Sequence, residues 1–298
     1  MRVRLLACLG TVLLFLLGTV PAQADGGDHP GRASYLALGD SVAFGFNPLV
    51  KNPKDVDTFV GYPEIVARKL GLKDVNAACS GEATGGFIDP HGLDNSCRAY
   101  RAAFPLHVSY KGTQLAFAIK YLKAHPQTRL VTLNLDANDF FRLSSGPSSD
   151  FWPPSTCFTP NLVQYFSTCA VQNLETIFSA IKATGYKGLI VALTYYALDY
   201  SDPNGLALSG LLNGAMSAAA TASGVLIASG FTAWQPFTAA FSGSSCNAGL
   251  LIRTSPTGCD IHPSPKGRDL LARAITQTIA NSCPEHDAQD CLEPNHND

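Results

Sequence analysis

Short apolar runs alternate along this chain with longer segments in which apolar residues recur at helical spacing. Five runs rich in leucine and β-branched residues predict strands: SYLALGD (34–40), KDVNAACSG (73–81), RLVTLNLDAND (129–139), KGLIVALTYY (187–196) and GVLIASGF (224–231). Helical spacing predicts helices over 62–70, 112–125, 171–184 and 207–223. Because alternating strands and helices form βαβ units, we expect one doubly wound, flavodoxin-like α/β domain of three layers, with a mainly parallel five-stranded sheet.

The last helix has the clearest start signal. Ser264 is a suitable N-cap, Pro265 suits the first helical position, and KGRDLLARAITQTIANS continues with helical spacing. The preceding segment CDIHPS is therefore expected to be a loop beside the start of this helix. In open α/β sheets, ligands bind at the carboxyl ends of the strands, so this loop is a candidate wall of a site.

Two connections are long for a compact α/β domain, residues 85–111 and 140–169. The first contains one cysteine and the second two, and these could tie the segments down. The two segments are equally consistent with walls of a binding crevice and with surface excursions that need cross-links.

The N-terminal 24 residues have the order of a secretory signal peptide. Arg2 and Arg4 precede the apolar run LLACLGTVLLFLLGTV, and Ala22-Gln23-Ala24 forms a small-residue cleavage site. A membrane anchor is the alternative, but the run is short for a bilayer span. We expect a secreted protein without a stable membrane anchor, with a flexible segment at 25–33, a folded domain at 34–282 and a polar, acidic tail at 283–298.

The cysteine count fits export. Removal of the signal peptide removes Cys8 and leaves eight cysteines, an even number that favours four disulfides in an exported protein. No couple has the short spacing of a zinc site, so we expect no metal. Neighbouring cysteines give the simplest pairing: Cys79-Cys97, Cys157-Cys169, Cys246-Cys259 and Cys283-Cys291.

Charge limits the range of partners. The 298 residues carry 21 Lys and Arg against 23 Asp and Glu, a formal net charge of -2, with no basic stripe. A nucleic-acid partner therefore has no electrostatic support.

Four polar blocks lie where a predicted strand passes into a loop or where the last helix begins. They are GDSVAFG from Gly39, NAACSGE from Asn76, LDAND from Leu135 and DIHPSPKG from Asp260. The Gly-x-Ser-x-Gly elbow of α/β-hydrolases is excluded for the first block because Ser41 follows the first strand of the domain, and that elbow comes much later in those folds. A parallel sheet brings the four blocks to one edge.

In these four blocks the chain resembles a secreted member of the GDSL family of esterases and lipases, within the SGNH hydrolase superfamily. The resemblance implies that Ser41 is the nucleophile and His262 the general base. It also implies an oxyanion hole formed by the backbone N–H groups of Ser41 and Gly81 and by the side-chain amide of Asn138. Glycine at position 81 is expected to let the substrate approach the backbone.

Two positions depart from the family pattern. Asp136 stands where the family often has glycine, two residues before Asn138. Cys259 stands where the family commonly has its acid, three residues before His262, and Asp260 is one position closer. Asp260 orients the histidine in one interpretation, giving a triad. In the other, a backbone carbonyl holds the ring and the pair acts as a Ser-His dyad.

The resulting expectation is a carboxylic ester hydrolase, an esterase or lipase, that works through an acyl-enzyme without metal or cofactor. Its partner would be a small-molecule or lipid ester, and we expect a monomer. The same site could serve an acyltransferase or a polysaccharide deacetylase, and the fold could instead be a catalytically silent carbohydrate- or surface-binding module. Aromatic residues that could line an acyl pocket are Phe87, Tyr100, Phe104, Phe151, Trp152, Tyr195 and Tyr196.

Overall fold

A central parallel sheet organises the protein in the computed structural model, which describes residues 33–145, 157, 159–283 and 288–292. Five strands form the sheet in the order β2-β1-β3-β4-β5, and every neighbouring pair is parallel. The strands are β1 (Ser34–Gly39), β2 (Lys73–Asn76), β3 (Thr128–Asn134), β4 (Leu189–Thr194) and β5 (Leu226–Ser229). This is the flavodoxin-like order, so the predicted fold class is confirmed.

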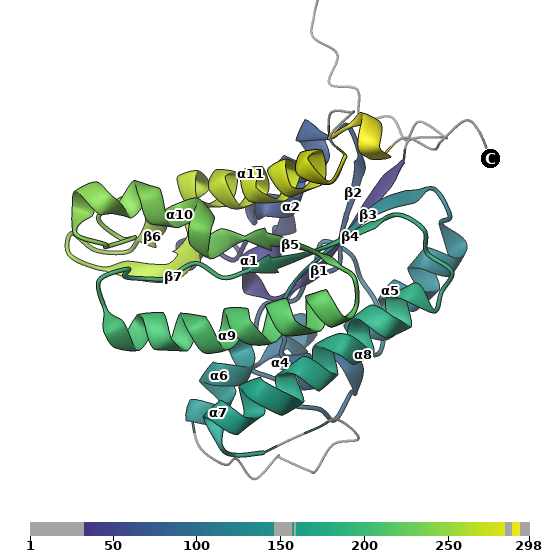
Figure 1. Ribbon diagram of the computed structural model, residues 1–298, viewed down its shortest axis with the longest axis horizontal. Coiled ribbons are helices and arrows are strands. Elements are labelled where there is room, and N and C mark those ends of the chain that lie inside the picture. The colour runs from purple at the N-terminus through teal and green to yellow at the C-terminus, as the bar shows by residue number, and fades with distance from the viewer. Residues whose placement is uncertain (1–32, 146–156, 158, 284–287, 293–298) are drawn as a thin grey trace, which may run out of the picture. The chain divides into compact units, whose positions relative to one another are not determined.

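Helices cover both faces of the sheet (Figure 1). On one face lie α2 (Tyr62–Lys69), α10 (Gly230–Thr238) and α11 (Pro265–Ser282). On the other lie α5 (Gln114–Ala124), α8 (Ala170–Lys182) and α9 (Pro203–Ala222). The helix predicted at 207–223 begins four residues earlier, because the Asp202 side chain accepts hydrogen bonds from two backbone N–H groups of the first turn and Pro203 takes the first helical position.

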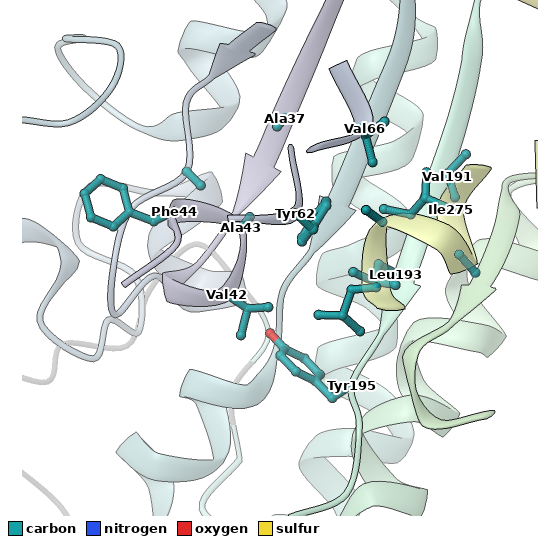
Figure 2. Packing of buried hydrophobic residues seen from close by; sticks show 14 of the residues in the cluster. Ala37, Val42, Ala43, Phe44, Tyr62, Val66, Val191, Leu193, Tyr195 and Ile275 are labelled. Carbon is teal, nitrogen blue, oxygen red and sulfur yellow. The ribbon is translucent and has the colours of Figure 1, made fainter. Parts of the chain in front are cut away.

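The core has two halves because successive side chains of a strand point to opposite faces. In β1, Tyr35 and Ala37 pack against the α2 and α11 side, whereas Leu36 and Leu38 pack against the α5 and α8 side. Figure 2 shows the first half, with Tyr195 at its end and its hydroxyl directed toward α1 (Ser41–Phe44). A strand buried on both faces reads as an uninterrupted apolar run, as the sequence does here.

The two long connections contain short helices. The first holds α3 (Thr84–Ile88) and α4 (Cys97–Ala103). The second holds α6 (Ala137–Ser144), α7 (Leu162–Gln164) and a π-helical turn at Tyr165–Cys169. The remaining elements are the short hairpin β6 (Leu251–Arg253) and β7 (Cys259–Pro263), and 3-10 turns at Val56–Thr58, Ala239–Phe241 and Asp290–Leu292.

The structure places the four expected cysteine pairs at disulfide distance: Cys79–Cys97, Cys157–Cys169, Cys246–Cys259 and Cys283–Cys291, with Cα atoms 4.9 to 5.9 Å apart. The first closes the loop that contains α3, and the third joins β7 to the loop before β6. The proposed signal peptide lies outside the described residues.

Candidate active site

Ser41 stands at the point where β1 passes into α1. Gly39 ends the strand with a φ of 142°, and a Cβ atom there would lie 2.2 Å from the carbonyl oxygen of Asn134, so only glycine fits. The Asp40 carboxylate then accepts a hydrogen bond from the Val42 N–H at 2.9 Å and caps α1. Ser41 is therefore the first helical residue, and it lines a cavity.

His262 reaches Ser41 from the opposite end of the sequence. Its Nε2 atom lies 2.9 Å from the Ser41 Oγ, and the ring packs against Phe46 at a centroid distance of 4.9 Å. The prediction that CDIHPS is a loop was wrong, because Cys259–Pro263 forms strand β7, paired with β6. The hairpin supplies a rigid support for the histidine, which is 9% exposed.

The Asp260 carboxylate accepts a hydrogen bond from the Nδ1 atom of His262. The same oxygen, Oδ1, also accepts from the His262 backbone N–H at 2.9 Å. Residues two apart in an extended strand point to the same side, which explains why a spacing of two residues brings the two side chains together. Burial alone would raise the pKa of Asp260, but the hydrogen bonds from His262 hold it below its usual value. The ring's partner in the structure is thus a carboxylate and not a backbone carbonyl.

Two contacts hold β7 in place, one just before Asp260 and one between Asp260 and His262. Cys259, at the usual position of the family acid, is joined to Cys246. The hydroxyl of Tyr196 donates a hydrogen bond to the Ile261 carbonyl at 2.8 Å. The residue that replaces the family acid therefore serves as an anchor for the strand that carries Asp260 and His262.

Gly81 lies beside the serine in the same cavity, and the reason for glycine differs from the predicted one. Its φ is 85°, and a Cβ atom would lie 2.1 Å from the backbone carbonyl oxygen of Asn95. The Asn95 N–H in turn donates to the Gly81 carbonyl at 3.0 Å. The space that a side chain would take at position 81 is thus filled by the chain itself, so its openness to substrate is not what requires glycine.

Asn138 lies at the start of α6 with its side chain held at both ends. Its Nδ2 donates to Asp40 Oδ2 at 3.2 Å, and its Oδ1 accepts from Asn95 Nδ2 at 2.8 Å. The Tyr195 hydroxyl also donates to Asp40 Oδ2. Burial raises the pKa of Asp40 to about 6, while the bonds from Tyr195 and Val42 act in the opposite direction.

Asp136 shows what the departure from the family glycine does. The residue is fully buried and has a φ of 106°, a backbone conformation that favours glycine. Neither carboxyl oxygen has a hydrogen-bond partner among the described residues. Burial raises the pKa of this carboxyl well above its usual range, and the neighbouring Asp139 and Asp40 act in the same direction, so the site favours the neutral form. Aspartate in place of glycine therefore strains the backbone of this loop at position 136.

A cavity of about 420 Å³ contains Ser41, His262, Gly81 and Asn138. Its walls are largely apolar, with contributions from Phe140, Phe141, Leu198, Leu208, Leu212 and Ile261. Three carboxyl side chains line it, those of Asp40, Asp199 and Asp202, and none of the described lining residues is Lys or Arg. Hydrogen bonds from the hydroxyl and backbone N–H of Ser201 hold the pKa of Asp199 below its usual value, so this carboxylate is ionised at neutral pH.

The candidate aromatic residues divide into three groups. Tyr195 and Tyr196 line the cavity. Phe87 is fully buried in the core, and Tyr100 and Phe104 pack against each other outside the cavity lining. Phe151 and Trp152 lie outside the described residues.

A cluster of possible metal ligands lies in the loop closed by Cys79 and Cys97. Within the described part of the chain, the ligand-type atoms of Glu82, Asp94 and Cys97 lie within 4.8 Å of one another. The sulfur of Cys97 is bonded to that of Cys79, so it is not the free thiolate that metal binding requires.

Sequence reasoning missed two residues of this site. It treated Asp40 only as part of a turn, although its position between a strand end and Ser41 could have indicated an N-cap. It gave no role to Asn95, which lies in the first long connection, 43 residues before the side chain it contacts. No local pattern identifies such a contact.

A chain of hydrogen bonds joins Ser41, His262 and Asp260 at the carboxyl edge of the doubly wound sheet. The protein belongs to the class of ester hydrolases that are built on such a sheet. More specifically, the chain belongs to the GDSL-like lipase/acylhydrolase family, whose model matches residues 37–270.

Solved structures share the fold at low sequence identity. A variant of an acetyl xylan esterase from Geobacillus stearothermophilus is 14% identical, with a TM-score of 0.52 over 83% of this chain and 94% of that one. Phospholipase A1 from Streptomyces albidoflavus is 17% identical, with a TM-score of 0.52 over 83% of this chain and 99% of that one. A putative GDSL-like lipase from Parabacteroides merdae is 13% identical, with a TM-score of 0.52 over 83% and 95%.

No curated protein matches the sequence significantly. In the described part of the chain, no helix combines the length and the apolar character needed to cross a bilayer.

Proposed function

We propose that this protein is an exported serine esterase that cleaves uncharged carboxylic esters with an apolar acyl chain. Ser41 is the nucleophile, His262 the general base and Asp260 the residue that orients the base. The oxyanion hole consists of the backbone N–H groups of Ser41 and Gly81 and the amide of Asn138. The observation that carries the proposal is the unbroken chain of hydrogen bonds from Ser41 through His262 to Asp260, inside a cavity.

The reaction has two halves. The Ser41 Oγ attacks the ester carbonyl carbon while its proton passes to His262 Nε2, and negative charge gathers on the carbonyl oxygen. The tetrahedral intermediate collapses, the bond to the alkoxide breaks, and the alkoxide leaves with the proton from Nε2. Water then attacks the acyl-enzyme in the same way and releases the acid and free Ser41.

The cavity walls support the choice of substrate. A volume of about 420 Å³ is much larger than an acetyl group needs and is in the range of pockets that hold a small-molecule ligand. Apolar side chains on these walls gain free energy when they cover an alkyl chain. The ionised Asp199, with no described cation among the lining residues, disfavours an ester that carries a negative charge near the scissile bond.

Labelling with a fluorophosphonate tests the nucleophile. The reagent should modify the wild type at Ser41 and leave Ser41→Ala unmodified, and the same substitution should abolish hydrolysis of p-nitrophenyl esters. A folded wild type that neither reacts with the probe nor hydrolyses any ester from two to twelve acyl carbons would favour the silent binding module.

A pair of esters of equal shape tests the charge preference. We expect 3,3-dimethylbutyl butyrate to be hydrolysed faster than an ester of equal size that bears a sulfonate, and Asp199→Asn should reduce the difference. Asparagine keeps the oxygen that accepts from Ser201, so the loop is retained while the charge is removed. Equal kcat/KM values for both esters in the wild type would refute the preference.

Export is tested by sequencing the N-terminus of the protein recovered from culture medium, which should be Asp25.

A further inference from the structure

Asn95, in the loop closed by Cys79 and Cys97, contacts both Gly81 and Asn138. It lies two residues before Cys97, and Gly81 lies two residues after Cys79, so the disulfide brings the two residues together at the neck of the loop. The Asn95 backbone N–H donates to the Gly81 carbonyl at 3.0 Å. Its side chain extends to Asn138, which comes from a different connection.

We propose that Asn95 is a positioning residue that joins the two external donors of the oxyanion hole and fixes the direction of the Asn138 amide. The inference rests on the proposed function, because it assigns Asn95 a part in stabilising the same oxyanion. Asn95 acts through its backbone on Gly81 and through its side chain on Asn138, and so it holds both donors from one residue.

The hydrogen-bond chemistry sets the direction of the amide. Asn95 Nδ2 is a donor and meets Asn138 Oδ1 at 2.8 Å. At the other end, the Asp40 carboxylate is an acceptor and meets Asn138 Nδ2 at 3.2 Å. A flipped Asn138 would set its carbonyl oxygen against the Asp40 carboxylate and its NH₂ group against that of Asn95.

One hydrogen of the Asn138 NH₂ group is used by Asp40, which leaves the second for the cavity. An oxyanion donor is effective only if it is aimed before charge develops, and the removal of one such donor costs roughly 10² to 10³ in kcat. Asp40 holds only the nitrogen end, by the longer of the two bonds, so the amide could turn about this contact if Asn95 were absent. Asn95 supplies the second point that fixes the plane.

A double-mutant cycle on kcat provides the kinetic test. Asn138→Ala should lower kcat roughly 10² to 10³-fold, and Asn95→Ala roughly 10-fold, with little change in KM. The double variant should be no slower than Asn138→Ala alone, because the side chain of residue 95 then has no amide to position, while the backbone bond to Gly81 is kept in every variant. Asn95→Asp, which has the same shape but cannot donate when ionised, should be at least as slow as Asn95→Ala. The control is His91→Ala, an exposed change in the same loop.

The side-chain amide signal of Asn138 provides a second readout that does not depend on turnover. In a ¹⁵N spectrum of the full chain, Asn95→Ala should shift the Asn138 Nδ2 signals, whereas His91→Ala should leave them unchanged. Asn95→Ala within twofold of wild type in kcat, or a double variant that loses the product of both single effects, would overturn the positioning role. An unchanged Asn138 signal would do so as well.

The two proposals fail in different ways. If Ser41 takes no fluorophosphonate and no ester is hydrolysed, the proposed function fails, while the amide signal still decides whether Asn95 positions Asn138. If the wild type is active and labelled but the cycle is additive, only the positioning role fails.

Discussion

Substitution of Asp260 by asparagine separates the charge of this residue from its hydrogen bonds. Two donors, the His262 backbone N–H and its Nδ1 atom, converge on Oδ1 of Asp260. The carbonyl oxygen of the introduced amide, and not its NH₂ group, should therefore take this position. The tautomer of His262 that can accept the Ser41 proton would then be kept, and only the negative charge would be lost.

The expected magnitude follows from the attraction between the carboxylate and the imidazolium that forms during attack. The Asp260 side chain is 26% exposed, so an effective dielectric constant of about 40 is reasonable, between the value for a protein surface and that of water. At a charge separation of about 3 Å the attraction is worth roughly 3 kcal/mol, which corresponds to about 100-fold in kcat. Asp260→Ala also frees the ring to rotate, and we expect a loss of roughly 10³ to 10⁴-fold.

The assay is p-nitrophenyl ester hydrolysis at pH 7.5 with all disulfides intact, alongside Ser41→Ala as the inactive reference. Asp269→Asn is the matched control, because Asp269 is a carboxylate of similar exposure on α11 whose described ion pairs are with Lys69 and Arg273. Thermal unfolding of each variant excludes a loss of folded protein. Asp260→Asn within threefold of the wild type would refute the triad and favour the dyad. Activity as low as that of Ser41→Ala would refute the argument that the two donors select the amide oxygen.

Three predictions concern stability. Asp136→Gly should raise the free energy of unfolding by about 1 kcal/mol, because it relieves a strained backbone and removes an unpartnered buried carboxyl; a lower melting temperature would contradict this. Burial and the charge of Asp94 raise the pKa of Glu82 from 4.5 to about 8. Between these two values the folded state holds a proton that the unfolded state releases, so the free energy of unfolding should fall as the pH rises from about 4.5 to 8. Urea unfolding at pH 5 and pH 8 should show a smaller fall in Glu82→Gln, and an equal fall would show that Glu82 does not carry it. Gly267→Ala should destabilise the protein by about 2 kcal/mol or more in the same assay, because the new Cβ would lie 2.3 Å from a backbone carbonyl oxygen. The matched change Gly210→Ala, in the interior of α9, places a Cβ that meets nothing within 4 Å and should stabilise the protein by up to about 1 kcal/mol.

Most of the architecture is predictable from the amino-acid sequence. The apolar runs predict all five strands, most clearly the central ones, because a parallel strand buried on both faces is apolar along its length. Helical spacing predicts five of the six described helices that cover the sheet, and α10 is the one it misses. The sequence also placed Ser41, Gly81 and Asn138 at strand ends, since the carboxyl ends of parallel strands meet at one edge.

The way in which these residues are held depends on contacts between segments that are distant in the sequence. Strand β7 is predicted from the sequence as a loop, because a strand of five residues that contains a histidine and ends in proline gives no clear periodic signal. Its extended backbone nevertheless makes a two-residue spacing sufficient for Asp260 and His262. The contact of Asn95 with Asn138 joins two connections that are distant in the sequence, and the close approach of Asn95 to Gly81 depends on how a cross-linked loop folds back. Such contacts arise from packing in three dimensions, which no local pattern in the sequence encodes.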